Sequence, residues 1–110
     1  MAEAISPIQL PEVTCAQSER EWLQNALQQR LDREYPPEPV NQEIAAQAAH
    51  VYIRQRMEGE NEVGAIAIAL ITEMQAFDFS QSFYGECAVA NMVSELLLER
   101  MGIASCCGRG

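Results

Sequence analysis

The sequence predicts an all-α fold: a compact bundle of about four helices with an extended N-terminal arm and a short C-terminal tail. Apolar residues recur at helical spacing in four segments, and prolines and glycines separate these segments. With 110 residues, of which 48% are apolar, the chain fits one domain with a hydrophobic core. We expect an arm over 1–13, a single helical domain over 14–102 and a tail over 103–110.

The first helix is expected to begin near Thr14 or Ser18, because each is followed three residues later by the Gln or Glu of a capping box. It carries one apolar stripe with a residue at every fourth position: Leu23, Leu27, Leu31 and Tyr35. Pro36 and Pro37 end the helix, because proline lacks the amide donor and clashes with the preceding turn.

The second helix follows a stiff connector, and Asn41 is a candidate cap for it. Gly59 is expected to end it in a left-handed conformation. Its buried side is marked by small and apolar residues at helical spacing: Ile44, Ala45, Ala48, Val51, Tyr52 and Met57.

The third segment, 63–71, is almost entirely apolar, and Asn61 or Gly64 is expected to open it. Its alternating pattern could also form a strand. We favour a helix, because alanine is a helix former and no partner strand exists elsewhere in the chain. A helix that is apolar all round is central in a bundle or is covered by another subunit.

The fourth helix is expected after a turn at 78–82, with Asp78, Ser80 or Ser82 as its cap, and to end at Gly102. We expect Cys87 to be a small core residue of this helix. Three successive leucines, 96–98, span about 200° of a helix, so one monomer core is not expected to cover them all. We therefore expect a homodimer built on the third and fourth helices, because twofold self-association is the commonest oligomer.

The charges exclude several classes of function. All seven basic residues are arginines, against 16 acidic residues, and the formal net charge is −9. The absence of lysine excludes a P-loop and Schiff-base chemistry. Nucleic acid and anionic membrane surfaces are not expected as partners, because the net field repels phosphate. No apolar run approaches the ~20 residues that cross a bilayer. The charge favours a protein partner with a basic surface.

Catalytic and metal-binding sets are not recognisable in the sequence. His50 is the single histidine, and Gln47 stands where a di-iron bundle would need Glu. Three acidic residues in the second connector, Glu58, Glu60 and Glu62, lack the spacing of a calcium loop and are interpreted as a solvated turn. We predict no catalytic residues, no metal and no cofactor. The hypothesis is a non-enzymatic interaction module: an adaptor, assembly chaperone or regulatory subunit.

An aromatic cluster is the best candidate for partner binding. Phe77, Phe79, Phe83 and Tyr84 fall within one turn region. If exposed, they are natural anchors for a partner protein; if buried, which is the commoner arrangement, they fix the connection between two helices. With Leu97 and Met101 of the fourth helix, they form the predicted partner-binding set.

Two alternative functions remain open. Cys106 and Cys107 are adjacent thiols that could make the chain a redox or soft-metal-responsive regulator, such as one binding Zn²⁺ or Cu(I). A small molecule could also bind in the helical core, in a pocket lined by methionines and a few polar groups: Met57, Met74, Met92, Met101, Asn91 and Thr72. The N-terminus has no signal-peptide pattern, so we expect a cytoplasmic protein with reduced thiols.

Overall fold

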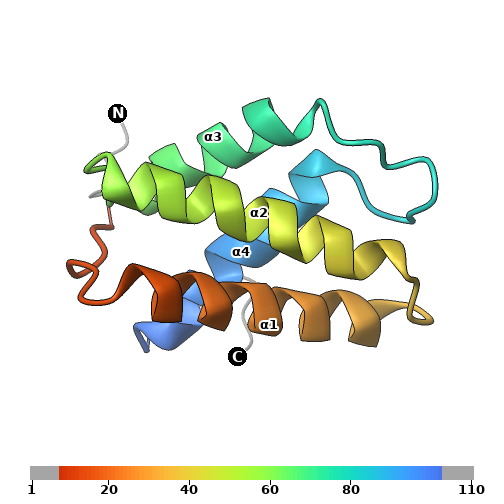
Figure 1. Ribbon diagram of the computed structural model, residues 1–110, viewed down its shortest axis with the longest axis horizontal. Helices are drawn as coiled ribbons and strands as arrows, with labels where there is room; N and C mark the ends of the chain where they lie inside the picture. The colour runs from red at the N-terminus through yellow and green to blue at the C-terminus, as the bar shows by residue number, and fades with distance from the viewer. Residues whose placement is uncertain (1–7, 103–110) are drawn as a thin grey trace, which may run out of the picture.

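The computed structural model describes residues 8–102 and contains four helices in that range. They are α1 (Ala16–Glu34), α2 (Val40–Met57), α3 (Val63–Met74) and α4 (Glu86–Arg100). Successive helices run in opposite directions (Figure 1). α1 packs mainly on α2 and α3 on α4, while contacts of α2 with α3 and of α1 with α4 close the bundle. The predicted all-α bundle is confirmed, and the alternating apolar segment is a helix.

Prolines and glycines end the helices where the sequence predicted. α1 ends at Glu34, two residues before Pro36. Gly59 and Gly102 follow α2 and α4 with φ of +97° and +81°, the left-handed region that glycine enters without a Cβ clash. None of the four helices in the described range is both long and apolar enough to cross a membrane.

The predicted N-terminal caps are wrong at α1 and α2. α1 begins at Ala16 after Cys15, whose side chain makes no capping hydrogen bond, so neither predicted capping box forms. α2 begins after Pro39, and Asn41 lies inside the helix. Asn41 is buried there and donates from Nδ2 to Asp32 Oδ1 at 2.8 Å. Its amide therefore fixes α2 to α1 instead of capping α2.

The starts of α3 and α4 also differ from the prediction. Glu62 caps α3, because its carboxylate accepts from the backbone N–H groups of Gly64 at 3.1 Å and Ala65 at 2.9 Å. A carboxylate at a helix N-terminus is also favoured by the helix dipole. α4 begins at Glu86 after Gly85, a turn later than the predicted caps at 78–82.

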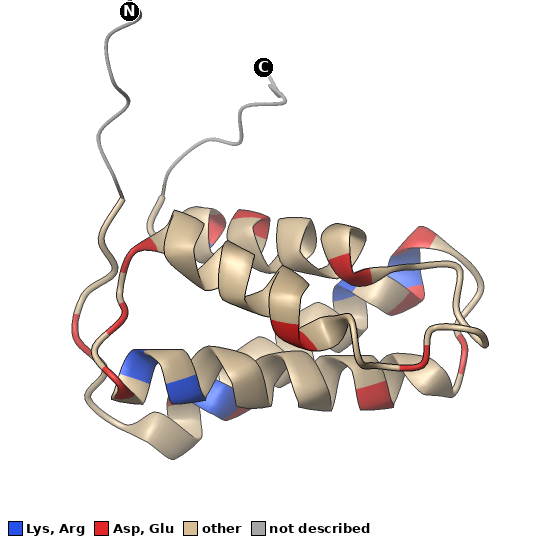
Figure 2. Ribbon diagram, turned by 90° about the horizontal axis from the view of Figure 1, so that it is seen from above, with Lys and Arg blue, Asp and Glu red and all other residues tan. Residues whose placement is uncertain are grey.

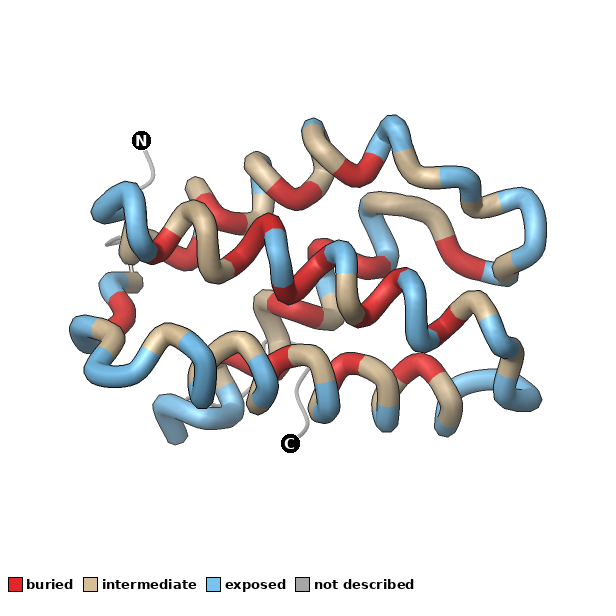
Figure 3. The backbone as a smooth tube through the Cα atoms, in the orientation of Figure 1, coloured by how far each residue is buried: buried red, intermediate tan, exposed pale blue. Residues whose placement is uncertain are grey.

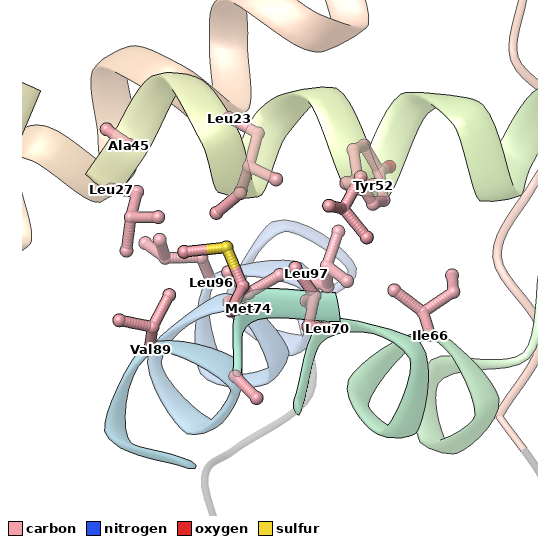
Figure 4. Packing of buried hydrophobic residues seen from close by; sticks show 14 of the residues in the cluster. Leu23, Leu27, Ala45, Tyr52, Ile66, Leu70, Met74, Val89, Leu96 and Leu97 are labelled. Carbon is pink, nitrogen blue, oxygen red and sulfur yellow. The ribbon is translucent and has the colours of Figure 1, made fainter. Parts of the chain in front are cut away.

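All four helices contribute to one hydrophobic core. Leu23, Leu27 and Leu31 of α1 are fully buried, as their spacing predicted. The labelled side chains of α2, α3 and α4 point into the same interior (Figure 4). Buried residues follow the inward sides of the helices, and exposed residues follow the outward sides (Figure 3). The core is therefore continuous between the helices.

The monomer covers α4 better than the sequence indicated. Leu96 and Leu97 are buried and Leu98 is partly buried. The prediction that α4 exposes more apolar surface than one monomer can cover is therefore wrong. Cys87, expected in the core, is exposed. The leucines are covered because α4 packs against both α3 and α1.

The excess of apolar surface lies on α3. This helix buries Ile66, Leu70 and Met74, whereas Ile68 is 66% exposed. Gly64 and Thr72, one turn on either side of Ile68, are also exposed. We call Gly64, Ile68 and Thr72 the α3 outer face. No charged residue occurs between Val63 and Thr72, so this face is neutral on an acidic protein.

The described part of the N-terminal arm lies across the connector between α2 and α3. The backbone N–H of Leu10 donates to the Asn61 carbonyl at 2.8 Å, and that of Val63 donates to the Ile8 carbonyl at 2.9 Å. Leu10 is buried in the core. These contacts attach the arm to the body of the same chain.

Candidate interaction surface

One end of the bundle brings together two connections that are far apart in the sequence. The connector 35–39 joins α1 to α2, and the loop 75–85 joins α3 to α4. Both lie at the right-hand side of Figure 1. Tyr84 fastens the loop to the bundle: its ring is buried, and its hydroxyl donates to the Leu31 carbonyl at 2.7 Å. We call this surface the aromatic end.

An exposed aromatic pair marks the aromatic end. The rings of Tyr35 and Phe83 stack with centroids 5.1 Å apart, and the Tyr84 ring meets Tyr35 edge-on at 5.7 Å. Tyr35 is 51% exposed and Phe83 is 67% exposed. Phe83 was predicted to bind a partner, whereas Tyr35 was predicted only as part of the stripe of the first helix. The sequence did contain a signal for its exposure, namely the neighbouring Pro36. The residue before a helix-ending proline adopts an extended backbone, so the Tyr35 side chain no longer follows the apolar face of α1.

The other predicted aromatic residues are more deeply placed. Phe77 and Phe79 contact each other with centroids 4.9 Å apart and are partly buried against the core. Tyr84 is buried. The turn region thus combines both arrangements that the sequence left open: three of its rings fix the connection between α3 and α4, and Phe83 is presented to solvent.

Leu97 and Met101 do not join this surface. Leu97 is buried in the core, which removes it from the surface that a partner can reach. Met101 is exposed just after the end of α4, so the full length of that helix separates it from the aromatic end.

A cleft of about 490 Å³ opens between the two connections of the aromatic end. Its apolar wall is formed by Pro39, Val40 and Phe77. Its polar lining contains three carboxylates and one amide, and no basic residue: Glu38, Glu43, Asp78 and Gln81. The volume and the mixture of an apolar wall with a few polar groups are typical of binding clefts, which hold roughly 300–1,000 Å³.

The electrostatics of this end are strongly acidic. The segments 31–43 and 75–86 contain six carboxylates and one guanidinium, that of Arg33, and acidic residues occupy both connections (Figure 2). A hydrogen bond from the Ser80 backbone N–H, at 2.9 Å, lowers the pKa of Asp78 and keeps it ionised near neutral pH. Burial raises the pKa of Tyr84, and the nearby charge of Glu34 acts in the same direction. The cleft therefore presents a negative field beside exposed aromatic rings.

Residues 6–101 of the sequence match the family described as Domain of unknown function (DUF8822). The chain belongs to this family. The match includes α1 to α4 and both connections of the aromatic end. No curated protein and no solved structure matches the chain.

A buried polar network lies at the opposite end of this DUF8822 domain, and sequence reasoning missed it. Arg56 is buried and donates to the Tyr52 hydroxyl at 2.6 Å, to Asn61 Oδ1 at 2.7 Å and to the Pro11 carbonyl. The Tyr52 hydroxyl donates in turn to Glu19 at 2.5 Å. Burial raises the pKa of Tyr52, so its hydroxyl keeps its proton. The network joins α1, α2 and the arm, which indicates a structural role.

The groups considered for metal or small-molecule binding are scattered in this DUF8822 domain. His50 is exposed, and the described residues contain no cluster of three metal-ligating side chains. Met74 is in the core and Thr72 is exposed. The remaining candidates line three different surface pockets. Met101 lines the first pocket, Met57 lines the second, and Asn91 and Met92 line the third. The structure does not bring the predicted lining residues into one pocket.

Two of the four cysteines, Cys15 and Cys87, lie within the described residues. Cys106 and Cys107, the predicted redox or metal pair, lie outside the described residues. Cys15 and Cys87 are free and exposed. The Ser18 hydroxyl donates to Cys15 Sγ at 3.2 Å, and this hydrogen bond lowers the pKa of the Cys15 thiol. A lowered pKa favours the thiolate, so we expect Cys15 to be a reactive thiol.

Iodoacetamide near neutral pH is expected to alkylate Cys15 faster than Cys87, because the thiolate is the reacting form. Peptide mass spectrometry over a time course measures both rates in the same sample. The Ser18→Ala variant removes the hydrogen bond to Cys15 and is expected to bring the alkylation rate of Cys15 closer to that of Cys87. Equal rates in the unmodified protein would contradict the assigned role of Ser18.

Proposed function

We propose that this DUF8822 domain is a non-enzymatic protein–protein interaction module, an adaptor, assembly chaperone or regulatory subunit, that docks through its aromatic end. The observation that carries the proposal is the exposed stack of Tyr35 on Phe83. Aromatic side chains dominate the energetics of protein interfaces. The edge-on contact with buried Tyr84 holds the pair in place before binding, so little further side-chain ordering is needed on association.

The charges around the pair favour a partner with a basic surface. Six carboxylates against one guanidinium surround the two connections, and opposite charge speeds encounter and selects among partners. We place this activity in the cytoplasm, since exposed free thiols such as Cys15 and Cys87 suit a reducing compartment.

The test compares proteins captured by three forms of the full chain. The double variant Tyr35→Ser with Phe83→Ser is expected to lose partners that the unmodified chain captures from the native organism. The matched control is Met57→Ser, which also removes an exposed apolar side chain, 55% exposed, but at the C-terminal end of α2, away from the aromatic end. Quantitative mass spectrometry measures the captured set, and circular dichroism checks the fold of each variant. An unchanged set for the double variant would refute docking through this end.

The proposal includes self-association through the α3 outer face. Ile68 is 66% exposed there, between Gly64 and Thr72. Two copies of a chain with a net charge of −9 repel each other over most of their surfaces. The uncharged stretch Val63–Thr72 is where two copies can meet with least repulsion, and burying Ile68 in both copies supplies a hydrophobic gain. We therefore propose a homodimer that uses α3; this keeps one of the two helices expected from the sequence.

Sedimentation equilibrium tests the homodimer. The unmodified chain is expected to associate with increasing concentration, and Ile68→Glu is expected to remain monomeric, because it buries two carboxylates against each other. Met57→Glu adds the same charge at another exposed apolar residue and is expected to associate normally. The homodimer would be removed from the proposal if the unmodified chain is monomeric at all concentrations. It would also be removed if Ile68→Glu and Met57→Glu weaken association equally.

A further inference from the structure

We propose that the cleft of the aromatic end receives an arginine side chain of the partner protein, so that the bound segment of the partner is basic and contains arginine. This inference rests on the proposed function, because it names the chemistry of the partner that docks beside Tyr35 and Phe83. The cleft lies between the same two connections that carry this pair.

The net charge of the cleft favours a cation even after the helix dipole is included. The cleft lies at the first turn of α2, where the helix dipole places a positive partial charge of roughly half a unit. Three carboxylates line the cleft: Glu38, Glu43 and Asp78. None of them takes part in an ion pair with another described residue. The carboxylates therefore outweigh the helix terminus, and their combined charge is available to an incoming cation.

Glu38 adds a more specific requirement. Its Oε1 atom is buried and has no hydrogen-bond partner among the described residues. A buried carboxylate oxygen without a donor is unfavourable in the unbound protein. Glu38 also lines the cleft, so a donor that enters the cleft can reach this carboxylate group. A guanidinium carries five N–H donors, enough to reach Glu38 and a second carboxylate together.

The apolar wall selects a flat organic cation. Phe77 and Pro39 line the cleft together with the carboxylates, and a guanidinium stacks on such surfaces better than a hydrated ammonium or a metal ion. The chain itself contains this arrangement elsewhere. Arg100 lies over the Trp22 ring at 3.9 Å from the centroid and donates to Glu19 at 2.9 Å. An aromatic ring and a carboxylate hold a guanidinium there, and the cleft offers the same two groups.

An NMR titration of the full chain tests the inference with a defined probe. The probe is a blocked pentapeptide with two arginines separated by glycine, and its control is the same peptide with neutral, nearly isosteric citrulline in place of arginine. The arginine peptide is expected to shift the backbone amide signals of 38, 40–43 and 77–81, and the citrulline peptide is expected to leave them unchanged. Equal shifts from both peptides would overturn the role of charge.

A pair of matched variants separates the cleft from the general charge of the molecule. Glu38→Gln with Glu43→Gln is expected to weaken binding of the arginine peptide about fivefold to tenfold, since each partly exposed ion pair contributes up to ~1 kcal/mol. Glu12→Gln with Glu58→Gln changes the net charge equally at exposed residues outside the cleft and is expected to leave affinity nearly unchanged. Phe77→Leu keeps the wall apolar and is expected to weaken binding about twofold to fivefold through loss of the ring face.

The inference would also be overturned by an equal loss of peptide affinity in the two charge variants, by no loss in the cleft variant, or by shifts at 38–43 that follow protein concentration without peptide. The last result would place a second copy of the chain in the cleft. If the arginine peptide fails while the Tyr35 and Phe83 variant still loses its captured partners, the inference is wrong and the proposed function stands.

Discussion

Replacing Arg56 by methionine is expected to lower the free energy of unfolding by about 3–5 kcal/mol, because one partner of a buried ionic network is removed. Arg56 supplies the donors for the Tyr52 hydroxyl and for Asn61, and it lies 3.7 Å from the Glu19 carboxylate. Methionine fills the volume of the stem but leaves these acceptors without a donor. Such a loss is a large part of the ~5–15 kcal/mol that stabilises an ordinary domain.

Urea unfolding measures this difference, and Arg54→Met is its matched control. Arg54 stands two residues earlier on the same helix and pairs with Glu73, with both side chains more than one third exposed. An exposed pair of this kind is expected to contribute at most ~1 kcal/mol. Equal destabilisation by the two variants would show that Arg56 does not act as a buried donor.

Hydrogen exchange adds a local readout for the same change. Arg56 also donates to the Pro11 carbonyl in the arm, and the arm is held as well by the amides of Leu10 and Val63 and by the buried Leu10 side chain. In Arg56→Met, these two amides are expected to lose protection before those in the middle of the helices, because the arm detaches by local opening. Their unchanged protection would show that the arm is held without Arg56.

The helices were predictable where the determining signal is local in the sequence. The stripe of Leu23, Leu27 and Leu31 lies on one face whatever the neighbouring helices are, so its spacing alone predicted burial. Pro36 and Gly59 act on their own backbone. Helix starts were predicted poorly, because several nearby side chains compete to accept the same free amides, and α3 uses Glu62 in place of the expected Asn61 or Gly64.

The candidate site was only half predictable, because its members meet through tertiary contacts. The Phe77–Tyr84 segment is visible as a local cluster, but nothing local shows that Phe83 stacks on Tyr35 of another connection. The same holds for the buried network, in which Tyr52 of α2 reaches Glu19 of α1 and Arg56 reaches the Pro11 carbonyl of the arm. The acidic balance of the chain indicated a basic partner, whereas the location of the cleft required the packing of α2 against the loop 75–85.

Truncation of Leu70 to alanine is expected to lower the free energy of unfolding by about 2–5 kcal/mol, through lost burial and the cavity that remains. Leu70 is fully buried beside Met74, although every residue from 63 to 71 is glycine or apolar. Ile68→Ala is the matched control in the same helix, because Ile68 is mostly exposed. It is expected to change stability by no more than about 0.5 kcal/mol, since alanine also has the higher helix propensity. Urea unfolding at low protein concentration measures both variants.

Protein concentration separates the two sides of α3. At low concentration the chain is monomeric, so only burial within the bundle contributes, and Leu70→Ala alone is expected to be destabilising. At high concentration, Ile68→Ala is expected to lower the midpoint urea concentration of unfolding relative to the unmodified chain. The reason is that dimerisation stabilises the folded state by mass action, and the substitution weakens the proposed dimer. Equal losses for the two variants at low concentration would mean that Ile68 is buried within the monomer. α3 would then have no free apolar face, and the proposal of self-association would lose its physical basis.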